Sequence, residues 1–334
     1  MPTQSSSRLG RRLLAVSAVV ATGLPLLAAC GSPSSTAQPA GRSAAASPAS
    51  ARPRVGIILG GGGETGIAWQ TGVLAALRDK AGLTPDVVDV VVGTSAGAFA
   101  GVAFSSKADL HRLVSNEKTG SVKSAPVTPG AGGAIPPEML AALGSTEGTI
   151  EERDKRIGAL AMSMKLPISS ADLVGYVATM LPATQWPALD FRATSVNAET
   201  GKTVLWKSAD GVPLAAAVAS SAAVPGFLPT VEINGQHYTD APRTSFSAAL
   251  VAEKHLDAII YIGMPTPNLS NTVEEDALKR LEAGGLRVVR ITGGPGSDEV
   301  IKGALDPKVR PKAVELGLSD GAAAADGVGK LLRH

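Results

Sequence analysis

The 334-residue sequence is poor in cysteine, histidine and aromatic residues. Its single cysteine excludes a disulfide within the chain. Its four histidines are scattered, and neither they nor the cysteine suggest a metal site, so we expect no metal or other cofactor. Aromatic residues make up only 3% of the chain, which means that Ala, Val, Leu and Ile must build the core.

The chain also lacks an excess of charge of either sign. It has 31 basic and 29 acidic residues, and the first 30 residues hold three of the arginines and no acid. The remainder therefore has 28 basic and 29 acidic residues and is close to neutral. Nucleic-acid binding requires a basic face, so we expect no nucleic-acid partner.

The first 30 residues have the features of an export signal. Three arginines precede an apolar stretch, residues 13–29, which ends in Leu27-Ala28-Ala29-Cys30. This ending is similar to the lipobox of bacterial lipoproteins, in which the cysteine is lipidated. We therefore expect an exported protein, anchored to the cell membrane through Cys30 and facing outside the cytoplasm. A plain signal peptide is the alternative, and an uncleaved membrane helix is disfavoured because a glycine and a proline interrupt a short stretch.

Two further segments follow the signal. Residues 31–52 are rich in Ser, Ala and Pro and have little to bury, which predicts a flexible tether. Residues 53–334 are long enough for one large domain.

The most informative motif is the pentapeptide Gly93-Thr94-Ser95-Ala96-Gly97. It follows a run of apolar β-formers at 86–92, and a strand that ends in Gly-x-Ser-x-Gly before a helix is the sequence form of a nucleophile elbow. Gly93 and Gly97 matter because such a turn is too sharp for neighbouring side chains. The pattern predicts Ser95 as a nucleophile.

A second glycine-rich turn lies upstream, between a predicted strand at 54–59 and a helix expected from near Glu64 to Lys80. The backbone N–H groups of Gly61, Gly62 and Gly63 are free to approach an oxyanion, and the helix N-terminus adds its positive dipole end. This arrangement favours an oxyanion hole for a tetrahedral intermediate.

The same glycines permit a rival interpretation. Gly61, Gly63 and Gly66 also satisfy the dinucleotide fingerprint, with Asp86 about 20 residues downstream for a ribose. However, Asp86 stands at the start of the next strand rather than at its end, and that strand leads into the serine motif. We therefore expect no nucleotide.

A candidate general base follows a predicted hairpin. Asn234-Gly235 between two short apolar runs is a strong signal for a type I′ turn, and Asp240 falls where the second strand ends. Strand ends are common places for catalytic groups. A structural aspartate that starts a turn is the alternative.

Strand-like runs alternate with helical stretches along most of the chain, which favours a mainly parallel sheet covered by helices. The runs lie at 54–59, 86–92, 189–196, 203–206, 257–263 and 286–292. Residues 105–185 interrupt the alternation with a long, mostly helical insertion. This insertion could form a lid or an acyl pocket, and ordinary helix packing is an equal alternative.

Taken together, these motifs resemble the patatin-like phospholipase family, most closely its bacterial, actinobacterial-looking branch. The resemblance spans roughly residues 54–265 and is carried by residues 61–66, the elbow at Ser95, the stretch from Ala219 to Gly226, and Asp240-Ala241. It implies a three-layer α/β/α fold with a mainly parallel central sheet. It also implies serine acyl hydrolysis of phospholipids or other acyl-ester lipids by a Ser–Asp dyad, here Ser95 and Asp240, without histidine.

Two departures from the family pattern bear on activity. The family often has Arg or Lys where this chain has Thr65, and Gly where it has Ala241 and Pro242. A catalytically silent, lipid-binding lipoprotein that keeps the fold is therefore the second hypothesis.

The chemistry expected of the dyad follows from general principles. Asp240 would take the proton of Ser95 and return it to the leaving alcohol, which requires burial to raise the carboxyl pKa above about 3.9. A Ser–Asp–His triad is the alternative, for which only His255 is a candidate. His111, His237 and the terminal His334 have ordinary structural or surface interpretations.

Overall fold

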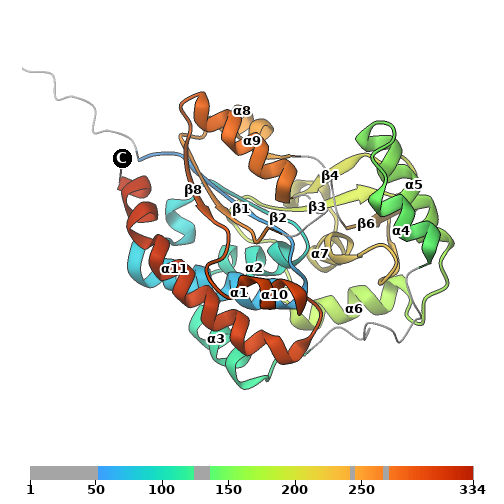
Figure 1. Ribbon diagram of the computed structural model, residues 1–334, viewed down its shortest axis with the longest axis horizontal. Coiled ribbons are helices and arrows are strands. Elements are labelled where there is room, and N and C mark those ends of the chain that lie inside the picture. Colours follow the sequence, from blue (N-terminus) through green and yellow to red (C-terminus); the bar gives the residue numbers. More distant parts are fainter. Residues whose placement is uncertain (1–51, 124–135, 241–244, 266–270, 334) are drawn as a thin grey trace, which may run out of the picture. The chain divides into compact units, whose positions relative to one another are not determined.

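The computed structural model describes residues 52–123, 136–240, 245–265 and 271–333 (Figure 1). Several predicted features lie outside these residues: the signal peptide, the lipidation site at Cys30, nearly all of the tether, and the departures at Ala241 and Pro242. Among the described helices, none is both long and apolar enough to span a bilayer.

The described core is an eight-stranded sheet in the order β5-β6-β3-β2-β1-β7-β8, with β4 paired to β3. The strands are β1 (Val55–Leu59), β2 (Val90–Gly93), β3 (Phe191–Asn197), β4 (Thr203–Trp206), β5 (Val231–Ile233), β6 (Gln236–Thr239), β7 (Ala258–Ile262) and β8 (Arg287–Ile291). The five strands β3, β2, β1, β7 and β8 run parallel, whereas β4, β5 and β6 pair antiparallel. The sheet is thus mainly parallel, as predicted.

The strand predictions hold with one shift. The run predicted at 86–92 becomes a strand only at Val90, because Pro85–Val87 form a short 3₁₀ turn, η1. Proline at the start of that turn has its φ fixed near the helical value, which favours the turn over an extended strand. The predicted hairpin is confirmed, since Asn234 and Gly235 both have the positive φ of a type I′ turn (52° and 75°).

Helices cover both faces of the sheet. They are α1 (Gly63–Ala81), α2 (Ala96–Ser105), α3 (Leu110–Thr119), α4 (Pro137–Gly144), α5 (Ile150–Ser163), α6 (Ser170–Met180), α7 (Leu214–Ala222), α8 (Ser247–Lys254), α9 (Asn271–Ala283), α10 (Ser297–Lys302) and α11 (Arg310–Arg333), with short 3₁₀ turns η2 (Ser208–Asp210) and η3 (Pro307–Val309). Figure 1 shows α8 and α9 on one side of the strands and α1, α2 and α11 on the other.

The alternation of side chains along the strands explains the two helical layers. In β1, Ile57 and Leu59 join the larger apolar core with α1, α2, α7 and α11, whereas Ile58 joins a smaller core with α8 and α9. Successive strand residues point to opposite faces, so a strand buried on both faces needs apolar residues throughout. The predicted three-layer α/β/α architecture is confirmed.

Helix α1, which follows the glycine-rich turn, packs against helix α11 with the two backbones in contact. A Cβ atom on Gly317 of α11 would lie 2.0 Å from the carbonyl oxygen of Trp69 in α1, and one on Gly72 would lie 2.4 Å from that of Val314. The indole N–H of Trp69 also donates to Asp320 at 2.8 Å. The last helix is therefore an integral part of the fold.

Candidate active site

Ser95 occupies a sharp turn between β2 and α2. Its φ and ψ of 53° and −117° are unusual for a residue with a side chain. A Cβ atom on Gly93 would lie 2.3 Å from the carbonyl oxygen of Gly97, and one on Gly97 would lie 2.3 Å from that of Leu59. Only glycine fits at either position, which accounts for both glycines of the motif.

The backbone at Ser95 is fixed by a neighbour that the sequence did not single out as functional. The N–H of Ser95 donates to Oγ of Ser221 at 3.0 Å, and both residues are buried. The adjacent Ser220 instead bonds Oγ of Ser195 in β3 at 2.7 Å. The two serines at the end of α7 thus connect the turn at Ser95 to the sheet.

Asp240 follows β6, which pairs with the same edge of β3 as β2 does but runs in the opposite direction. Val196 of β3 pairs with Thr203 of β4 and with Thr239 of β6, so β6 lies on the edge away from β4. Ala193 likewise pairs with both β4 and the end of β2, which puts β2 on that same edge. The strands β2 and β6 therefore meet end to end along β3, and their facing ends lead into Ser95 and Asp240.

The gap between the two strand ends is short. Gly93 is level with Ala193 and Thr239 with Val196, a separation of three residues, or about 10 Å at ~3.3 Å per residue. The end of α7 borders this gap, because the carbonyl of Ala223 accepts the N–H of Asp240 at 3.0 Å. One short segment of α7 and its C-terminal extension thus contacts the backbone of both candidate residues.

The glycine-rich turn lies beside Ser95. A Cβ atom on Gly61 would be 3.7 Å from that of Ser95. In the described part of the chain, the N–H groups of Gly61, Gly62, Gly63 and Ala96 donate to no protein acceptor. The backbone of Gly62 is extended, with φ of 164°, whereas Gly63 has φ of 64°. The predicted oxyanion donors are therefore next to the predicted nucleophile, and the N–H of Ala96, which the sequence analysis did not name, is a further candidate donor.

An apolar cavity of about 80 Å³ opens at Ser95. Its lining comes from α1, α2, the end of α7 and, across the cavity, from Leu173, Tyr176, Val177 and Met180 of α6. Burial raises the pKa of the Tyr176 phenol, which stays protonated and donates to the carbonyl of Lys123 at 3.2 Å. The insertion at 105–185 thus contributes a wall of the cavity.

Asp240 lines a different hollow, of about 10 Å³, with Asp154, Thr239 and Pro225 among its walls. Ala222 and Val224 line the cavity at Ser95, and Pro225 lines the hollow at Asp240. The chain that follows α7 therefore runs between the two spaces.

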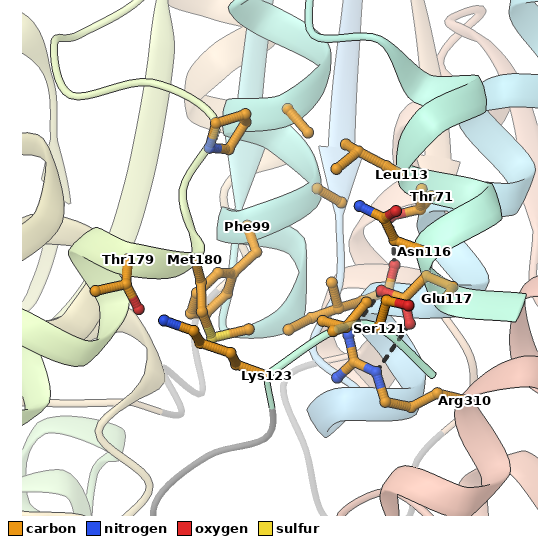
Figure 2. Close-up of a pocket in the computed structure, with 15 residues that line it drawn as sticks. Thr71, Phe99, Leu113, Asn116, Glu117, Ser121, Lys123, Thr179, Met180 and Arg310 are labelled. Carbon is orange, nitrogen blue, oxygen red and sulfur yellow. Dashed lines mark hydrogen bonds and ion pairs between the residues drawn. The ribbon is translucent and has the colours of Figure 1, made fainter. Parts of the chain in front are cut away.

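A buried ion cluster supports the first turn of α1. The Arg310 guanidinium donates to both carboxylate oxygens of Glu117 at 2.8 and 2.6 Å (Figure 2). It also lies 3.4 Å from Glu64. Burial raises the pKa of Glu117, against the opposing effect of Arg310. Thr65, where the family often has a cation, donates its hydroxyl to the carbonyl of Val300. Glu64, in the first turn of α1, is thus paired with a cation from the start of α11.

None of the three described histidines lines the cavity at Ser95. His111 lies 3.2 Å from Asp79, and Nδ1 of His237 lies 2.8 Å from Glu199. His255 terminates α8 with a left-handed backbone. The fourth, His334, lies outside the described residues.

Asp86, the residue on which the nucleotide interpretation depended, lies at the N-terminal end of β2, in η1. It is exposed and pairs with Lys107 at 2.7 Å. The glycine turn follows the C-terminal end of the parallel neighbour β1, so Asp86 and the glycines lie at opposite ends of the sheet. This placement does not suit a ribose contact.

Comparisons with known proteins agree with this architecture. The patatin-like phospholipase family matches residues 57–246, more than half of the chain. The lysophospholipase NTE1 of Chaetomium globosum is 44% identical over 64 residues, which make up 19% of this chain and 4% of that protein. This chain therefore spans only a small part of that relative.

Two solved structures are similar over most of the chain. VipD from Legionella pneumophila matches 82% of this chain and 67% of its own, with 12% identity and a TM-score of 0.41. ExoU, in its complex with SpcU from Pseudomonas aeruginosa, matches 83% of this chain and 52% of its own, with 14% identity and a TM-score of 0.35. From the extent of the family match, the chain belongs to the patatin-like phospholipase family.

Proposed function

We propose that the protein is a serine acyl hydrolase that cleaves carboxylic esters of membrane lipids, in the manner of a phospholipase A or lysophospholipase of the bacterial branch of its family. The observation that carries this proposal is the position of Ser95. Its strained turn opens on an apolar cavity, beside backbone N–H groups without protein acceptors and opposite the strand end that carries Asp240.

The proposed reaction has two steps. Oγ of Ser95 attacks the ester carbonyl as Asp240 removes its proton, and the N–H groups of Gly61, Gly62 and Gly63 stabilise the oxyanion. Asp240 then gives the proton to the departing alcohol, which leaves the acyl group on Ser95. In the second step Asp240 activates a water molecule, whose attack releases the fatty acid and restores the serine.

Proton transfer requires the Asp240 carboxylate to come within about 2.6–3.2 Å of the serine oxygen, directly or through one water. The end-to-end arrangement of β2 and β6 supports this requirement, because Ser95 and Asp240 each follow one of the two strand ends that border the gap. Such hydrogen bonds are often longer in free enzymes and shorten when substrate binds.

Labelling with an alkyl fluorophosphonate tests the proposal. A competent site would form a covalent adduct on Ser95, located by peptide mass spectrometry, and Ser95→Ala would remove both the adduct and ester hydrolysis. Ser220→Ala, which changes a neighbouring buried serine whose hydroxyl bonds Ser195 and Ala217, is the matched control. A folded wild-type protein that neither labels nor hydrolyses any ester would refute it.

A catalytically silent lipid-binding protein is the second candidate. Thr65 favours it, because this side chain supplies no cation to the glycine turn and instead bonds Val300. The same labelling experiment separates the two candidates, since a silent protein would bind lipid without forming the adduct.

We further propose that the protein is exported and anchored to the membrane by a lipid on Cys30, on the basis of Leu27-Ala28-Ala29-Cys30. Cys30→Ser is expected to release the protein from the membrane fraction or to leave an unprocessed precursor, because serine cannot carry the lipid that the anchor requires. Stable anchoring needs two or more acyl chains. Mass spectrometry that found an unmodified Cys30 in the mature, membrane-bound protein would contradict the anchor.

A further inference from the structure

A second cavity adjoins the one at Ser95 and is about three times larger, at 240 Å³ against 80 Å³. It lies among α1, α2, α3 and the end of α6 (Figure 2). Neither Ser95 nor the glycine turn lines it. The proposed reaction therefore leaves this larger space without a role.

The two cavities have a wall in common. Ile67 of α1, Phe99 of α2 and Met180 of α6 line both. Figure 2 shows Phe99 and Met180 beside each other, with Glu117 and Arg310 across the larger cavity. Phe99 is 9% exposed and Met180 is partly exposed, and both line the two spaces where these adjoin.

The size of the smaller cavity limits what it can hold alone. An apolar cavity of about 150 Å³ accommodates one benzene ring, so a space of 80 Å³ takes only a few methylene groups. A longer acyl chain attached to Ser95 must continue elsewhere. The adjoining cavity shares three lining residues with it and offers such a space.

The lining of the larger cavity is more apolar than polar by area, although Lys123, Glu117 and Arg310 contribute charged groups to it. Ala100, Ala103 and Leu113 give it apolar walls. Arg310 lies at its edge, but both oxygens of Glu117 already accept hydrogen bonds from that guanidinium. The buried cation is therefore satisfied within the protein and does not call for an anionic ligand.

We propose that the larger cavity receives the distal part of the acyl chain. In this arrangement the chain on Ser95 passes between Phe99 and Met180, and these two side chains decide how long a chain the enzyme accepts. The inference rests on the proposed acyl hydrolase function and extends it to the substrate: an ester of a medium- or long-chain fatty acid.

The first test fills the larger cavity without touching the smaller one. Thr179 lines only the larger cavity, and its neighbour Ala178 lines neither, although both are exposed. We expect Thr179→Trp to lower the ratio of kcat/KM for p-nitrophenyl decanoate to that for p-nitrophenyl butyrate by about 15-fold. This factor corresponds to two lost methylene contacts at ~0.8 kcal/mol each. Ala178→Trp is expected to leave the ratio unchanged.

A buried substitution gives an independent measure. Ala103 lines only the larger cavity, and Ala103→Leu should lower the same ratio while Met180→Ala, which widens the passage, should raise it. Met162→Ala, an identical change at an exposed site on α5, is the control for Met180→Ala. A ratio that stays the same in Thr179→Trp and in Ala103→Leu would overturn the proposal.

A binding measurement separates this inference from catalysis. Ser95→Ala protein should bind decanoate more tightly than butyrate in calorimetry, and Thr179→Trp in that background should reduce the preference. Equal affinity for the two acids would overturn the proposal even if the wild type hydrolyses esters. Failure of the proposed function has a different signature: no hydrolysis of any ester and no labelling of Ser95, with the preference for decanoate retained.

Discussion

The two sides of the candidate site differ in character. Ser95 faces an apolar cavity that can hold part of a hydrocarbon chain, whereas Asp240 faces a hollow of about 10 Å³ that it lines with another carboxylate, Asp154. The chain that follows α7 runs between them and contacts the backbone on both sides. The proposed nucleophile and the proposed base thus lie beside different spaces, and the backbone N–H of each is bonded to the segment at the end of α7.

The largest expected effect is on the Asp240 side. Asp240→Asn nearly preserves shape but removes the proposed base, so kcat should fall by about 10²–10⁴-fold or more with little change in melting temperature. Steady-state kinetics on a short-chain ester would measure it. His111→Ala, His237→Ala and His255→Ala should each stay within about threefold of the wild type. A histidine variant as impaired as Asp240→Asn would rule out the dyad.

On the Ser95 side, the ion cluster below the glycine turn should matter mainly for stability. Arg310→Leu leaves the Glu117 carboxylate buried without its cation, which should cost about 3–5 kcal/mol in urea unfolding at neutral pH. Arg280→Leu, an exposed arginine on α9, is the control. Replacing Arg310 and Glu117 together by leucine should recover much of the loss.

The loss in Arg310→Leu should depend on pH in a definite direction. Burial raises the pKa of Glu117, and Arg310 opposes this effect, so the variant should have a still higher value. A carboxyl whose folded pKa exceeds its unfolded value near 4.3 favours folding below that pH, and this contribution is lost as pH rises through the folded pKa. The deficit should therefore be smaller at pH 5 than at pH 7.5. An equal deficit at both would exclude Glu117 as its source.

A smaller effect is expected from the oxyanion turn. The extended backbone of Gly62 would tolerate a side chain, but its Cβ would lie 2.9 Å from Cα of Gly66 and displace the turn. Gly62→Val should therefore lower kcat by about 10²-fold, the usual scale for one lost oxyanion donor. Gly144→Val, where a Cβ meets nothing within 4 Å, is the control. Full activity in folded Gly62→Val would place the donors elsewhere.

The smallest expected effect concerns Ser220 and Ser221, two adjacent serines at the end of α7. Ser221→Ala removes the acceptor for the Ser95 N–H and should lower kcat by about tenfold, since an unpaired buried N–H costs about 1–3 kcal/mol. Ser220→Ala breaks a bond to Ser195 instead and should affect melting temperature more than kcat. Equal losses of kcat in both variants would mean that Ser221 does not act through Ser95.

The local parts of this site could be predicted from sequence, and the long-range parts could not. The turn at Ser95 and the hairpin before Asp240 depend on glycines and on Asn234-Gly235, whose backbone requirements are local. By contrast, nothing in the sequence of β6 indicates that it continues the edge occupied by β2, because strand order depends on pairing between distant segments. A one-dimensional pattern also cannot show that Arg310 pairs with Glu117, 193 residues away.

The close packing of α1 and α11 has a consequence for the order in which the site can be assembled during synthesis. The glycine turn opens α1, but the arginine that supports the first turn of this helix begins α11, and the two helices touch along their backbones through Gly72 and Gly317. A growing chain has synthesised Ser95 and Asp240 long before it contains α11. Until α11 is made and docks, the arginine beneath the glycine turn is absent, so we expect the first turn of α1 to gain its ion pair later than β2 and β6 can be formed.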